Sequence, residues 1–132
     1  MPDLISIDEA REHLRLDSAA DDPWLSMFIP AISEAVRLWL KDEWRPYQVG
    51  VDSNGEPVLD SDGRPVVVLD SDGEPVVRWT VKAACLVELA SQYRFREGEG
   101  KDNVMPADAG HGYVLNKAST ALLTPLRRPT AA

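Results

Sequence analysis

Three acidic turns of nearly identical sequence occur at residues 52–58, 60–66 and 70–76. They read DSNGEPV, DSDGRPV and DSDGEPV. Closely spaced aspartates followed by glycine are typical of calcium-binding loops, in which carboxylate oxygens surround the ion. A loop of the EF-hand type also needs an oxygen ligand at its first position and a glutamate at its twelfth. None of the repeats meets both requirements in any register, so the sequence supports at most weak cation binding.

The same repeats also predict β-structure. Asn-Gly and Asp-Gly dipeptides favour two-residue hairpin loops, and the residues between them are mainly valine and leucine. Because the proline in each repeat lacks an N–H, a wide sheet is not expected. We therefore predict a narrow β-hairpin or meander that lies on the helices or on a neighbouring copy. A low-complexity insertion that forms a solvated loop is the third interpretation.

Few other residues could take part in chemistry. The histidines are His13 and His111, and the one cysteine is Cys85. Neither histidine has a cysteine or carboxylate neighbour at metal-site spacing, and Cys85 lies in an apolar helical stretch that disfavours a thiolate. The sequence has no phosphate-binding glycine loop and no nucleophilic serine elbow. We expect no catalytic residue, no metal ligand, no cofactor and no enzymatic activity.

Charge is distributed unevenly along the chain. Residues 49–77 hold seven acids and one base, which together account for −6 of the net charge of −8. After Asp108 the charged side chains are Lys117, Arg127 and Arg128, all of them basic. An acidic chain of this kind does not hold nucleic acid by bulk charge.

The length of 132 residues predicts a single domain, residues 1–132, with one core. Within it we expect an acidic arm at residues 49–78 and a short basic tail at residues 125–132. No apolar stretch reaches about 18 residues, so a membrane span is not expected.

Two helices are predicted before the arm. Ser6-Ile7-Asp8-Glu9 is a capping box that should begin a helix over residues 7–14. Apolar residues at three- and four-residue spacing then predict a long amphipathic helix from about residue 22 to about Glu43 or Trp44. Pro30 lies inside this second helix and is expected to kink it.

Two further helices are predicted after the arm. The third begins near Thr80, and its first turns are apolar on nearly every side, so it should be the most buried. The fourth covers residues 113–123 and ends before Pro125. The predicted fold is mainly α: a small bundle of about four helices, with a β-hairpin or meander inserted between the second and third.

Three segments of the chain, taken in order, form a recognisable pattern: ISIDEAREHLRLDSAADDPWLSMFIPAISEAVRLWL (5–40), VKAACLVELASQYRFREG (81–98) and ALLTPLRRP (121–129). This pattern resembles the head–tail connector (head-completion adaptor) family of tailed phages and prophages. The resemblance implies a structural subunit that forms a ring of about twelve copies under the portal. Such a ring extends the DNA channel, binds the portal and a tail terminator or stopper protein, and lets DNA pass without specific binding.

The expected location follows from this resemblance: the head–tail junction of the virion, and the host cytoplasm during assembly. The threefold acidic repeat is not part of the family pattern. A small cation-binding or regulatory module that uses the repeat is the alternative function.

Two groups of residues are predicted to contact partners. The basic tail residues Leu126, Arg127 and Arg128 should bind the portal or tail. Large apolar residues in and beside the arm should mediate self-association: Trp44, Val58, Leu59, Val66, Val67, Val68, Leu69, Val76 and Trp79.

Overall fold

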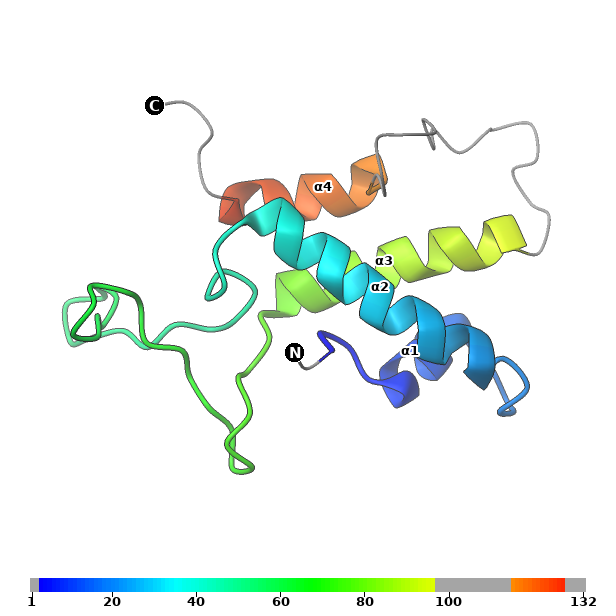
Figure 1. Ribbon diagram of the computed structural model, residues 1–132, viewed down its shortest axis with the longest axis horizontal. Helices are drawn as coiled ribbons and strands as arrows, with labels where there is room; N and C mark the ends of the chain where they lie inside the picture. The colour runs from blue at the N-terminus through cyan, green and yellow to red at the C-terminus, as the bar shows by residue number, and fades with distance from the viewer. Residues whose placement is uncertain (1–2, 97–114, 128–132) are drawn as a thin grey trace.

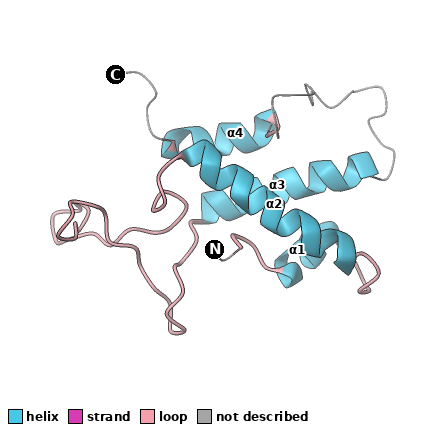
Figure 2. Ribbon diagram, in the orientation of Figure 1, coloured by secondary structure: helices cyan, strands magenta, loops and turns pink. Residues whose placement is uncertain are grey.

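Within the part of the chain that the structure describes, four α-helices form the framework, which confirms the prediction of a mainly helical fold (Figure 1). The computed structural model describes residues 3–96 and 115–127. The helices are α1 (Ile7–Leu14), α2 (Asp22–Leu40), α3 (Trp79–Arg96) and α4 (Lys117–Leu123), and the 3₁₀ turn η1 (Thr124–Leu126) follows α4. Within these residues there is no β-sheet (Figure 2). No helix in this part of the chain is long and apolar enough to cross a membrane.

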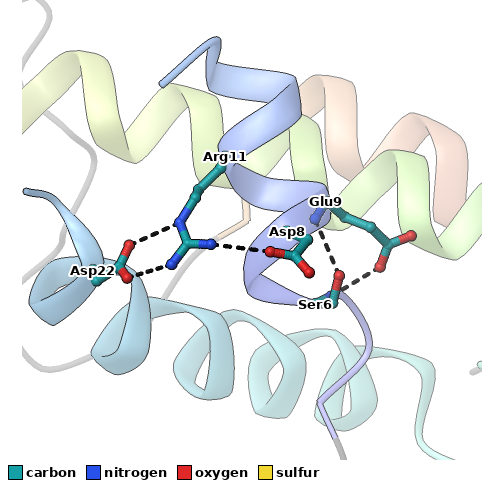
Figure 3. A network of polar contacts seen from close by, with 5 residues as sticks. All are labelled: Ser6, Asp8, Glu9, Arg11 and Asp22. Atoms are coloured by element: carbon teal, nitrogen blue, oxygen red, sulfur yellow. Dashed lines mark hydrogen bonds and ion pairs between the residues drawn. The ribbon is translucent and has the colours of Figure 1, made fainter. Parts of the chain in front are cut away.

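The predicted capping box begins α1. The Ser6 hydroxyl accepts the Glu9 N–H at 3.1 Å, and a Glu9 carboxylate oxygen accepts the Ser6 N–H at 2.8 Å (Figure 3). The other Glu9 oxygen accepts a hydrogen bond from the Lys82 ammonium of α3 at 2.8 Å. Burial acts to raise the pKa of Glu9, but the hydrogen bonds from Lys82 and Ser6 outweigh it and lower the pKa. One carboxylate therefore caps α1 and also fastens it to α3.

An ion-pair network joins α1 to α2. Arg11 lies between Asp8, on its own helix, and Asp22, the first residue of α2 (Figure 3). Its guanidinium donates to both carboxylate oxygens of Asp22, with an Nε–Oδ1 distance of 3.0 Å, and to Asp8 at 3.0 Å. The hydrogen bond from Arg11 lowers the pKa of Asp22. Because a bidentate pair fixes the direction of both side chains, it holds the start of α2 beside α1.

Helix α2 ends earlier than the sequence predicts. Its last residue is Leu40, because Lys41 adopts a positive φ of 80° while its N–H donates to the Arg37 carbonyl at 2.9 Å. The chain therefore leaves the helix before Trp44. At Pro30, which is exposed, the helical conformation continues on both sides.

The core lies where the four helices meet. It contains the apolar residues Ala10, Leu25, Ile29, Ile32, Val36, Leu40, Val81, Ala84, Cys85, Leu89 and Leu123. Burial raises the pKa of the Cys85 thiol to about 12, so the residue stays protonated and packs as a small apolar side chain, as predicted.

The N-terminal segment is tied to the middle of α2. The buried Ser33 hydroxyl accepts the Leu4 N–H at 2.9 Å and donates to the Ile29 carbonyl at 2.8 Å. Leu4 and Ile5 are both buried in the core. Through these contacts the segment is fixed in place before α1 begins.

The fully buried Glu88 determines where α4 begins. One of its carboxylate oxygens accepts the Asn116 N–H at 2.8 Å, and the other accepts the Gln92 amide at 3.1 Å. Asn116 in turn caps α4 by accepting the Ser119 N–H at 2.8 Å. The helix therefore begins after Asn116 and not at residue 113, which lies outside the described residues.

Replacing Glu88 with alanine should destabilise the fold, because the Asn116 N–H and the Gln92 amide would lose their acceptor inside the core. We expect the free energy of unfolding to fall by about 1–3 kcal/mol. Denaturant unfolding measures this loss. Glu34→Ala, at an exposed position of α2, is the matched control and should change stability by less than about 0.5 kcal/mol. Equal losses in the two variants would contradict the role given to Glu88.

The Arg11–Asp22 pair should make stability depend on acidity. Arg11 holds the pKa of Asp22 below the ordinary value of 3.8, so the pair contributes stability above that value and loses it as the pH falls through the folded-state pKa. Asp22→Asn should therefore be less stable than the parent chain at neutral pH, and this difference should shrink on acidification. Thermal unfolding measured across pH, with the exposed Asp17→Asn as control, tests this; a difference that is constant down to the most acidic pH would refute it.

Candidate functional site

Each acidic repeat forms one turn that is closed by its first aspartate. In the second repeat, the Asp60 carbonyl accepts the Gly63 N–H at 3.0 Å, and the Asp60 N–H donates to the Arg64 carbonyl at 2.8 Å. One oxygen of the Asp60 side chain also accepts the Asp62 N–H at 2.8 Å and the Arg64 N–H at 3.0 Å. Both the backbone and the carboxylate of Asp60 are therefore used to hold the turn.

The other two turns repeat this geometry. Asp52 and Asp70 each accept two backbone N–H groups with one carboxylate oxygen, at distances between 2.8 and 3.0 Å. The glycines at 55, 63 and 73 have φ values of 78°, 77° and 80°, and a Cβ at any of them would meet nothing within 4 Å. The left-handed conformation alone therefore requires glycine there. The Asn or Asp before each glycine does not have positive φ, so the turns differ from the two-residue hairpin loops that these dipeptides favour.

The segment before the first turn and the segments that follow the first and second turns join in a closed ring of hydrogen bonds. The Gly50 N–H donates to the Val66 carbonyl at 2.9 Å, the Val66 N–H to the Val58 carbonyl at 2.8 Å, and the Val58 N–H to the Gly50 carbonyl at 2.9 Å. Each of the three segments thus bonds to the other two. They must lie at the corners of a triangle and not side by side in a sheet.

A second ring closes nearer the helices. The Gln48 N–H donates to the Val76 carbonyl at 2.8 Å, the Val76 N–H to the Val68 carbonyl at 2.9 Å, and the Val68 N–H to the Gln48 carbonyl at 2.9 Å. The segments at residues 48–50 and 66–68 take part in both rings.

The prediction of a β-hairpin or meander is therefore wrong. The arm has only isolated antiparallel bridges: Tyr47–Val77, Val49–Val67, Val51–Pro57, Leu59–Pro65 and Leu69–Pro75. Pairing stops after one bridge because each segment then bonds to its other neighbour in the triangle. Proline occupies one side of the bridge at every turn, at a position where the bridge uses no N–H.

The base of the arm is packed against the helical bundle. Tyr47 is buried, and its hydroxyl accepts a hydrogen bond from the Arg37 guanidinium at 3.3 Å. Val67 and Val77 pack against the core, and the Arg78 N–H donates to the Pro46 carbonyl at 3.0 Å. Val67 was predicted to mediate self-association, but it packs against the core and attaches the arm to the bundle.

Most of the other predicted arm residues are exposed to solvent. Leu59 and Leu69, which precede the second and third turns, are 57% and 58% exposed. Val51 precedes the first turn and is 63% exposed; the prediction omitted it, although the register of the repeat points to it. Val58, Val66 and Val68 are also exposed, whereas Val76 is half-buried.

The two predicted tryptophans lie in different surroundings. Trp79, the first residue of α3, is 78% exposed, and the Lys82 ammonium lies 5.8 Å from its ring centroid. Trp44 is half-buried, and the Arg45 guanidinium carbon lies 4.6 Å from its ring centroid. Trp79 is therefore available to a partner over most of its surface, while Trp44 is partly covered.

Two open clefts flank the arm. The first, of about 550 Å³, lies between the loop after α2 and the second and third turns, and its lining includes Trp44, Asp60 and Pro75. The second, of about 460 Å³, lies between the N-terminal segment, the third turn and the start of α3, with Trp79 and Lys82 among its lining residues. Among the residues that the structure describes, no group of three or more His, Cys, Asp or Glu side chains is arranged to hold a metal ion.

The predicted portal-binding tail makes contacts within its own chain. The Arg127 guanidinium carbon lies 4.4 Å from the Trp39 ring centroid, and its Nε donates to the Trp39 carbonyl at 3.1 Å. Arg45 donates to the Leu126 carbonyl at 3.0 Å. The tail residues Leu126 and Arg127 therefore fasten η1 to α2 and to the loop that follows α2. Arg128, like His111, lies outside the described residues.

Comparison of the chain with protein-family models, with curated proteins and with solved structures gives no match. The resemblance to the connector family therefore stays a prediction.

Replacing Asp60 with alanine should loosen the second turn, because the Asp62 and Arg64 N–H groups would lose their side-chain acceptor. Amide hydrogen exchange at residues 62 and 64 should become several-fold faster, the equivalent of about 1 kcal/mol of lost protection. Asp62→Ala removes a carboxylate from the same turn and serves as the matched control. Equal acceleration in both variants would show that charge, and not the hydrogen bonds of Asp60, protects the turn.

Proposed function

We propose that the chain is a structural subunit of the head–tail connector of a tailed phage or prophage. In this role, copies form a ring under the portal that extends the DNA channel and receives the tail or a stopper. A mainly helical bundle suits such a subunit, since helices can pack laterally around a central opening. The resemblance of three sequence segments, in the expected order, is the starting point for the proposal.

One structural observation carries the proposal: although the bundle has a buried core, large apolar side chains are exposed on the arm and at the start of α3, as Met27 and Leu38 are on α2. Val51, Leu59, Leu69 and Trp79 are each more than half exposed. Surfaces that meet another protein are often rich in exposed apolar side chains. The arm has a packed base, so these side chains are held at defined positions, as a repeated assembly contact requires.

The charge of the arm is compatible with a channel through which DNA slides. Residues 49–77 carry a net −6, and the acids at the turns are exposed. Carboxylates repel phosphate groups, so a surface of this kind does not retain a passing duplex. An acidic subunit can therefore surround DNA without binding it.

The geometry of the repeats disfavours the alternative function as a cation-binding module. Asp52, Asp60 and Asp70 each use one carboxylate oxygen for two backbone N–H groups of their own turn. In a calcium loop the carboxylate oxygens point to a common ion. Here the first aspartate of each repeat instead holds its own turn closed by accepting backbone N–H groups.

Assembly of the chain tests the proposed function. We expect sedimentation velocity to detect oligomers at raised protein concentration, or on mixing with the portal protein of the same phage. Electron microscopy of these oligomers should reveal rings with a central opening. Compact monomers under all conditions, with portal and without it, would overturn the proposal.

Calcium titration separates the two functions. We expect calorimetry to detect no binding up to millimolar calcium, since the turns are already closed by hydrogen bonds. Magnesium is a suitable parallel titration, because adventitious binding to clustered carboxylates discriminates little between the two ions. Micromolar, calcium-selective binding would favour the cation-binding module.

A further inference from the structure

The arm leaves two kinds of surface group without a structural use in its own chain. The first is the set of exposed apolar residues, which includes Leu59 and Leu69. The second is the set of exposed turn acids other than Asp52, Asp60 and Asp70, namely Glu56, Asp62, Asp72 and Glu74. A partner that covers the arm must therefore offer both apolar contact and positive charge.

One end of the chain has the complementary charge. From residue 109 to residue 132 the sequence contains no acid, and its charged side chains are Lys117, Arg127 and Arg128. The described part of this end is α4 with η1. The outer face of α4 presents Lys117, Ala118 and Ala121 to solvent. Small side chains there let another chain approach the helix closely.

The arm does not meet this surface within one molecule. It extends away from the helical bundle, whereas α4 lies along the bundle beside α3 (Figure 1). Helix α4 is held there by the Ser119 hydroxyl, which donates to the Ala84 carbonyl at 3.2 Å, as well as by the bonds of Glu88. The surface that complements the arm is therefore fixed in place but separated from it.

We propose that the acidic arm of one copy docks on the α4–η1 surface of the next copy. This inference rests on the proposed function, because it assigns the contact through which copies join. The apolar residues of the arm supply the buried area, and the turn carboxylates face the α4–η1 surface of the neighbour, which contains no acid and exposes Lys117. Charge complementarity of this kind sets the register of a contact and discourages arm-to-arm pairing, in which −6 would meet −6.

The contact joins two different surfaces, so it is heterologous. Each copy then offers one arm and one α4 surface, and copies can add in one direction until the ring closes. An isologous contact of arm with arm would instead stop at a dimer. The two arrangements therefore differ in the number of copies that can be linked through the arm.

Cysteine cross-linking tests the contact in the full-length chain. Ser61→Cys lies at an exposed turn of the arm and Ala118→Cys on the exposed face of α4. The native Cys85 is buried, with a thiol pKa of about 12, so it does not compete for a maleimide reagent. Under conditions where sedimentation detects assembly, the double variant treated with a flexible bismaleimide should give a ladder of dimers, trimers and higher species.

A matched pair of cysteines serves as the control. Ser61→Cys combined with Ser26→Cys, an exposed position on α2, should give about tenfold less cross-linked product. Equal ladders from the two pairs would overturn the proposal, and so would dimers from Ser61→Cys alone, which indicate arm-to-arm contact. If the parent chain assembles but the double variant gives no cross-links, the arm contact is rejected, whereas the proposed ring is not. Absence of any assembly would reject both.

Substitution of the apolar residues gives an independent readout. Leu59→Ser with Leu69→Ser should raise the protein concentration needed for assembly by roughly tenfold or more, with the helical circular dichroism unchanged. Met27→Ser with Leu38→Ser changes two side chains of α2 that are 63% and 71% exposed, and should leave assembly as it is. A larger effect from the α2 pair would place the contact elsewhere and overturn the inference.

Discussion

One constraint shapes the arm: its backbone N–H and C=O groups must be paired without a β-sheet. Two rings of three hydrogen bonds satisfy it, and each ring joins segments that are distant in sequence, such as Gln48 and Val76. The carboxylates of Asp52, Asp60 and Asp70 pair further N–H groups inside the turns. Backbone pairing therefore holds the arm together, so its apolar side chains are not all needed for a core of its own. This division of roles is what leaves leucine and valine on the surface.

Much of the helical framework could be predicted, because its signals are local. A capping box involves residues three apart, and an amphipathic helix repeats its pattern every few residues, so α1, α2 and the buried α3 follow from the sequence. The ends were harder to predict when a distant residue determines them. Helix α4 begins after Asn116 because Glu88 accepts its N–H, a contact between residues 28 positions apart. The periodicity of the sequence does not indicate such a contact.

The candidate site shows the same division between local and distant signals. The acidic turns and their glycines were recognisable because each turn is closed within five residues. The triangle was not, since it depends on which of several similar segments pair with one another. Arg127 illustrates the problem for the tail: it was assigned to a partner on charge alone, whereas it stacks on Trp39, 88 positions away. A charged residue near a chain end can equally serve to fasten that end.

The two rings also define what each repeat contributes to the arm. Each eight-residue unit, such as Leu59–Val66, closes its own turn through local bonds, so copying a unit needs no new distant partner. A ring of three, however, needs three segments, and removal of the unit at residues 59–66 takes one corner from the ring that joins Gly50, Val58 and Val66. One donor and one acceptor would then lack a protein partner. The first ring therefore depends on the first two turns, and the second ring, which joins Gln48, Val68 and Val76, depends on the third.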